Sequence, residues 1–86
     1  MKIKRSNQPT FNTTSFYLSC FLLARGIQLV GLDQTDDTDR RSFVFVDSPN
    51  RQILTDEFNF AEDAEVSVRD FISAIRQLKA LLHEPK

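Results

Sequence analysis

The side chains that most often carry catalysis are scarce in this chain of 86 residues. It has one histidine, His83, and one cysteine, Cys20. A structural zinc site takes four cysteine or histidine ligands, which one copy of each cannot provide. Two glycines are too few for a phosphate-binding loop, and no serine stands in a Gly-x-Ser-x-Gly turn. The sequence therefore predicts no catalytic residue, no cofactor and no metal site, and a protein that is not an enzyme. An active site formed only between subunits is the enzymatic alternative.

The segment 33–40 is rich in carboxylates, which can bind calcium when their spacing is ordered. Its acidic residues are Asp33, Asp36, Asp37 and Asp39. Counted from Asp33, however, Thr38 stands in place of the glycine of an EF-hand loop, and Val44 in place of its closing glutamate. We interpret the segment as a solvated loop, with adventitious binding of a divalent ion as the alternative.

Two groups of basic residues could contact the phosphates of a nucleic acid, because cationic arms and β-ribbons both do so. They are Lys2, Lys4 and Arg5 near the start of the chain, and Arg40 and Arg41 at the start of an expected strand. The whole chain has 11 basic and 12 acidic residues and a net charge of -1, which gives no general polyanion signal. A small nucleic-acid-binding accessory protein is therefore the alternative function.

The expected location is the cytoplasm, without a membrane segment. The longest apolar run, 16–24, is nine residues long and includes Ser19, whereas a membrane-spanning helix needs about 20. The basic residues at the start precede this run as in a signal peptide, but residues 7–15 are mostly polar. The single cysteine cannot close an intrachain disulfide, which fits a reducing compartment, and we expect it to be buried and inert.

These residues must be positioned by a small fold, and the length predicts one domain. We expect a flexible basic arm over 1–13, in which Phe11 can fold back, and a single α+β domain over 14–84. The first helix should run from about 15 to 25, capped by Thr13 or Thr14 and apolar on almost every side, which predicts burial on most faces. Gly26 should end it, with Ile27 contacting Leu22 across the stop.

Two strands follow, and together they predict a two-stranded antiparallel hairpin. Segments 27–32 and 41–46 are rich in residues that favour β-structure. Alternation places Ile27 and Leu29 on one face and Val30 and Leu32 on the other. In the second strand, Phe43 and Phe45 oppose Val44 and Val46. Both faces of the sheet are therefore expected to be apolar.

Two helices should complete the order α-β-β-α-α. Ser48 caps the first, with Pro49 at its first position, and its apolar stripe is Ile53, Leu54 and Phe58. An acidic connector over 59–65 follows, with Phe60 packed inward. The last helix has a capping pair, Ser67 and Asp70, and a hydrophobic staple, Val66 and Phe71. Its stripe is Val68, Phe71, Ile75, Leu78 and Leu82, widened by Ile72 and Leu81.

A two-stranded sheet is only marginally stable alone, and here both of its apolar faces must be shielded from water. We therefore predict a non-catalytic protein-interaction module, either a homo-oligomer or a subunit of an assembly with another protein. The candidate interface residues are Val30, Leu32, Val44, Phe45 and Val46. The alternative is a chain that covers its own sheet, with the first helix between the sheet and the last helix.

One segment also resembles a known pattern. Residues 17–26 read Tyr-Leu-Ser-Cys-Phe-Leu-Leu-Ala-Arg-Gly, and they are followed by Phe43-Val44-Phe45 and by a helix with Asp70-Phe71. This order is similar to an uncharacterised family of short bacterial and phage proteins, a domain of unknown function, whose first helix is of the type Tyr-Leu-x-x-Phe-Leu-Leu-x-x-Gly. The likeness spans about residues 14 to 82. The resemblance implies a fold and a phage or mobile-element context, and it brings no activity and no site residues.

Overall fold

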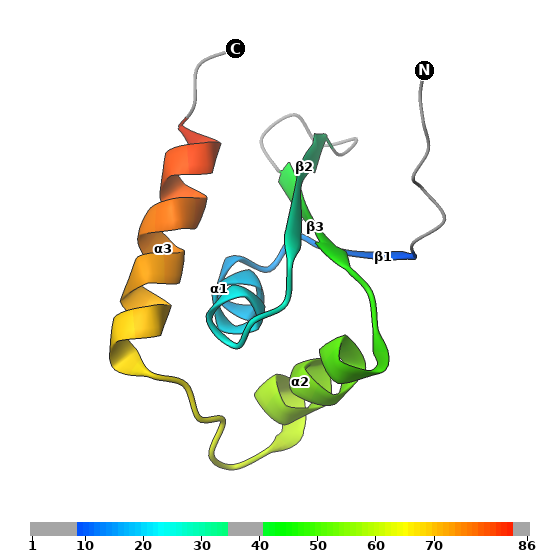
Figure 1. Cartoon of the computed structure of the whole chain (residues 1–86), viewed down its shortest axis with the longest axis vertical. Helices are drawn as coiled ribbons and strands as arrows, with labels where there is room; N and C mark the ends of the chain where they lie inside the picture. Colours follow the sequence, from blue (N-terminus) through cyan, green and yellow to red (C-terminus); the bar gives the residue numbers. More distant parts are fainter. Residues whose placement is uncertain (1–8, 35–40, 84–86) are drawn as a thin grey trace.

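The computed structural model describes residues 9–34 and 41–83. Its elements are β1 (Thr10–Thr13), α1 (Phe16–Ala24), β2 (Leu29–Gln34), β3 (Arg41–Val46), α2 (Pro49–Phe60) and α3 (Val68–Leu82). The predicted α+β class is confirmed. Figure 1 shows the layers: α1 lies between the sheet and α3, and α2 packs against a further side of α1.

The sheet has three strands rather than the predicted two. Its order is β1-β3-β2, and both pairings are antiparallel. The extra strand, Thr10–Thr13, lies within the segment expected to be an arm. Phe11 pairs with Phe45 across β1 and β3 and packs against the core. A strand with one large apolar residue among polar ones gives a weak sequence signal, which is why it was missed.

A bulge in β2 changes which residues face the core. Leu29 pairs with Phe45 and Leu32 with Phe43, and the register shifts between Leu29 and Gly31. A bulge places two residues opposite one, so the alternation of faces is interrupted at Val30. Leu29 and Leu32 therefore both pack against the core. The prediction that Leu32 faces away from Leu29 is wrong for this reason.

α1 is held at both ends by hydrogen bonds that the sequence partly foretells. The hydroxyl of Ser15, not of Thr13 or Thr14, accepts the capping bond from the Leu18 amide at 3.2 Å. At the other end Gly26 has a φ of 99°, and the amide of Ile27 donates to the carbonyl of Leu22 at 3.0 Å. This is the hydrogen-bond pattern of a Schellman stop. The predicted glycine stop is confirmed.

α2 and α3 begin where the caps predict but present more apolar surface to solvent than expected. The hydroxyls of Ser48 and Ser67 accept from the third residue of each helix, Arg51 and Asp70. The predicted inward position of Phe60 is wrong, because its side chain is 80% exposed. Three further members of the predicted stripes are also exposed: Ile53 on α2, and Val68 and Ile72 on α3.

The core is one cluster to which all three helices contribute. Its fully buried residues include Phe45 of β3, Leu22 of α1 and Leu78 of α3. Leu54 of α2 joins them at 3% exposed. The chain therefore covers one face of its sheet with its own helices. The first helix lies between the sheet and the last helix, as the alternative to self-association predicts.

Over the described residues, no helix has the length and apolar character that a membrane crossing requires.

Candidate protein interface

The face of the sheet that points away from the core carries three valines. We call Val30, Val44 and Val46 the outer valines. Val30 is 58% exposed, and the other two are half-buried. None of the three belongs to the core cluster or packs against it. They are thus the valines of the sheet that lie outside the core of the described chain.

Polar side chains surround the outer valines. Thr10 pairs with Val46 and Asn12 pairs with Val44, so Thr10 and Asn12 lie on the face of the outer valines, and both are exposed. Asp33 lies on this face through its pairing with Ser42. An apolar centre with a polar rim is the usual composition of a protein interface.

Two of the five predicted interface residues lie elsewhere. Phe45 has no exposed surface, and Leu32 packs against the core. Both belong to the inner face, because β3 alternates and the bulge in β2 turns Leu32 inward. They are therefore left out of the candidate interface, and a Phe45→Asp variant would test folding rather than association.

The edges of the sheet are poor sites for adding another strand. β1 has four residues, and three of them are polar. β2 is broken by the bulge at Val30 and ends in Asp33 and Gln34. Short strands, bulges and charges are the devices by which proteins discourage pairing at an edge. The outer face, rather than an edge, is the better candidate for contact.

Most of the predicted phosphate-contact residues cannot be placed. Lys2, Lys4, Arg5 and Arg40 lie outside the described residues. Arg41 begins β3, where it pairs with Gln34 and is half-buried. Nucleic-acid binding by this set stays a prediction.

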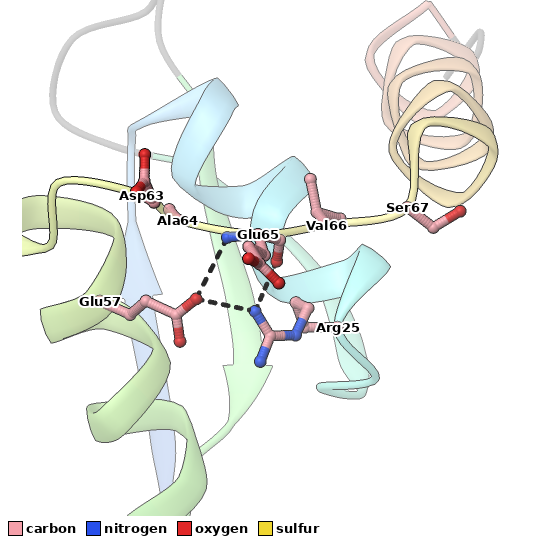
Figure 2. A pocket seen from close by; sticks show the side chains of 7 residues that line it. All are labelled: Arg25, Glu57, Asp63, Ala64, Glu65, Val66 and Ser67. Carbon is pink, nitrogen blue, oxygen red and sulfur yellow. Dashed lines mark hydrogen bonds and ion pairs between the residues drawn. The ribbon is translucent and has the colours of Figure 1, made fainter.

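A surface hollow of about 680 Å³ is built around Arg25 (Figure 2). The guanidinium group of Arg25 donates to the Glu57 carboxylate at 3.0 Å and to the Glu65 carbonyl at 2.6 Å. The Glu65 amide donates to the same carboxylate at 3.3 Å. Arg25 and the Glu65 amide, through hydrogen bonding, hold the pKa of Glu57 below its ordinary value.

These three residues form what we call the Arg25 clasp, which joins α1, α2 and the connector to α3. Because the guanidinium group of Arg25 and the carboxylate of Glu57 already bind within the clasp, neither offers a free charge to a ligand in the hollow. Arg25 and Glu57 are 32 residues apart, and no local pattern pairs them. Sequence reasoning missed the clasp for that reason, and its role is to hold the elements together.

A second arginine fastens β1 to α2. Arg51 is almost buried, with its guanidinium carbon 3.8 Å from the centre of the Phe11 ring. The same group donates to Asp47 at 2.8 Å and to Thr55 at 3.1 Å. The hydrogen bond from Arg51 is the main reason that the pKa of Asp47 lies below its ordinary value. This contact explains how the short strand β1 is held against the fold.

The residues with catalytic potential lie apart. Cys20 has no exposed surface, and burial raises the pKa of its thiol to about 11. His83 is exposed at the end of α3. In segments 9–34 and 41–83, no three histidine, cysteine or acidic residues are grouped so as to hold a metal ion. Asp36, Asp37 and Asp39 of the expected acidic loop lie outside these segments.

Comparison with known proteins places the chain in a family. The family model described as "Domain of unknown function (DUF5659)" matches residues 8–84, nearly the whole chain. The chain therefore belongs to this family, which agrees with the resemblance to a domain of unknown function; the bacterial or phage context stays a prediction. No curated protein and no solved structure matches the chain.

Proposed function

We propose that this member of the DUF5659 family is a non-catalytic protein-interaction module that self-associates through the outer face of its sheet. The observation that supports the proposal best is the separation of the outer valines from the core. Val44 and Val46 occupy the central strand, where side chains are normally covered, and yet they pack against no core residue. Covering them would remove apolar surface from water, which favours association.

The arrangement of the face suits contact with a second copy. A two-fold interface uses the same patch on both partners, so the side chains of the patch must pack against the same patch of the second copy. Valines pack against valines without unpaired polar groups, and Thr10 and Asn12 at the rim can hydrogen-bond across the contact. The clasp and the Arg51 contact lie among the helices and β1, so association through the outer face leaves them undisturbed.

The experiment compares the solution mass of the wild-type chain with that of Val44→Asp and Val30→Asp, by light scattering across a series of concentrations. Each substitution buries a carboxylate in the proposed contact, which is strongly unfavourable. Both variants should lose sheet-mediated association at concentrations where the wild type retains it. Gln77→Asp, at an exposed position of α3, is the control and should behave as the wild type.

Circular dichroism and thermal unfolding check that each variant is folded. Val30→Asp guards against a folding effect, because Val30 is 58% exposed and lies at a bulge rather than in the central strand. A folded Val30→Asp and a folded Val44→Asp that both keep the wild-type association would refute the proposed contact.

A further inference from the structure

The outward side of α3 is both apolar and basic. A shallow hollow of about 550 Å³ lies along it, lined by Val68, Arg69, Ile72, Ser73 and Arg76. Val68 is 74% exposed and Ile72 is 44% exposed, although the side chains are large and apolar. Along the whole helix, three basic residues accompany one acidic residue, Asp70. We call the five lining residues the α3 surface.

The outward side of α2 is apolar and acidic. Ile53 and Phe60 are seven residues apart, which places them on one side of the helix, and they are 61% and 80% exposed. Asp56 stands between them on the same side, and Glu62 lies two residues after the last residue of the helix; both are exposed. We call Ile53, Asp56, Phe60 and Glu62 the α2 surface.

The charges of the two surfaces are not paired within the described chain. Over 9–34 and 41–83, the ion pairs are those of Arg25 with Glu57 and of Arg51 with Asp47. Arg69, Arg76 and Asp56 take part in neither. Figure 1 shows α2 and α3 diverging from the connector, with α1 packed against both. Each surface therefore faces outward, available to another molecule.

We propose that the α3 surface of one copy docks on the α2 surface of a second copy. Each surface has two exposed apolar side chains and charges of one sign, and the signs are opposite. Apolar anchors supply most of the binding energy of an interface, and complementary charges set the partner and the register. A second copy is the occupant because the chain itself carries the matching half of the contact. The proposal rests on the proposed function, since both require self-association, but it names a separate contact.

Charge reversal tests this contact directly. Arg69→Glu with Arg76→Glu makes both surfaces of a chain acidic, and Asp56→Lys with Glu62→Lys makes both basic. Each variant alone should self-associate through the helices about tenfold more weakly or worse, because like charges then face one another. An equimolar mixture of the two variants should recover the association, because each α3 surface again meets an α2 surface of opposite charge.

The substitutions are compatible with the helices. Arg69→Glu places an acid in the first turn of α3, and Glu62→Lys places a base just after the end of α2, and the helix dipole favours both. Arg76→Glu and Asp56→Lys lie at exposed positions within the helices. Gln77→Glu is the control for Arg76→Glu, because Gln77 is exposed on α3 and, nine residues after Val68, lies on the opposite side of the helix. It should weaken association less than Arg76→Glu.

Every variant of this experiment also carries Val44→Asp, and the chain with Val44→Asp alone is the parent. Light scattering then measures the helical contact without the sheet contact. Val30→Asp replaces Val44→Asp throughout if Val44→Asp does not fold. The parent should still associate, and more weakly as salt rises, because salt screens exposed charges. A parent that is monomeric beside an associating wild type, or a mixture that does not recover, would overturn the helical contact and leave the sheet contact standing. A folded parent with the full wild-type association would overturn the sheet contact instead.

Discussion

The guanidinium group of Arg25 lies 3.0 Å from the carboxylate of Glu57, and this pair joins the end of α1 to α2. Both side chains are partly shielded from water, with exposed fractions of 33% and 26%. The pair also fixes the backbone of Glu65, to which Arg25 and Glu57 each contribute one hydrogen bond. The connector to α3 is thereby held in place, and so is the direction in which α3 leaves the fold.

The Arg25 clasp makes stability depend on pH in acid. The pKa of Glu57 is lowered in the folded chain. The contribution of its carboxylate to the stability of the fold is therefore present above the ordinary pKa of glutamate, about 4.3, and is lost as the pH falls through the pKa of the folded chain. Glu57→Gln should therefore lower the thermal unfolding midpoint at neutral pH and have a smaller effect at about pH 3. Calorimetry at the two pH values checks this. An equal effect at both would contradict the role assigned to the ionised carboxylate.

The glycine stop of α1 should be sensitive to substitution. Gly26 has a φ of 99°, which residues with a Cβ atom rarely adopt, and there is open space around the position. Gly26→Ala should therefore reduce the free energy of unfolding by about 1–2 kcal/mol through backbone strain alone. Gly31→Ala is the matched control, because Gly31 also has open space but no positive φ. Its effect in urea unfolding should stay within about 0.5 kcal/mol, and equal losses for both would argue against the stop.

β1 should depend on the contact between Phe11 and Arg51. With the guanidinium carbon 3.8 Å from the ring centre, a cation–π interaction of about 0.5–2 kcal/mol is expected. A double-mutant cycle of Phe11→Leu and Arg51→Gln measures it from the free energies of unfolding. If the two losses simply add, the ring and the guanidinium group do not interact as described.

Cys20 should be unreactive in the folded chain. It has no exposed surface, and because burial raises the pKa of its thiol to about 11, the reactive thiolate is scarce at mildly alkaline pH. A thiol reagent should modify it only as fast as the chain opens, and at once in denaturant. Rapid modification without denaturant would show that the interior around Cys20 is open.

The sequence predicts well what depends on neighbouring residues. The bounds of β3, the stop at Gly26 and the caps at Ser48 and Ser67 all follow from short patterns that act locally. These patterns predict which hydrogen bonds a segment can make within itself, and those hydrogen bonds are present in the structure.

Features that depend on distant pairing are not predictable in this way. β1 exists because Phe11 meets Phe45, far along the chain, and the bulge at Val30 appears only in the register of β2 against β3. α2 offers apolar residues on more than one side, so its sequence leaves open whether Ile53 and Phe60 or Leu54 and Phe58 face the core. The interface prediction included Phe45 because strand alternation alone does not reveal which face the helices cover. It included Leu32 because the bulge that turns this residue inward appears only in the pairing of β2 with β3.

Light scattering on the wild-type chain, at two protein concentrations and two salt concentrations, measures whether the chain self-associates. Self-association through the two proposed contacts predicts a mass above the 9.9 kDa of a single chain, rising with protein concentration and falling in part as salt rises. The part that falls as salt rises reports the charges of the α2 and α3 surfaces, whereas contact between the outer valines should not depend on these charges. A mass of 9.9 kDa under all four conditions would contradict the claim that this chain associates with itself.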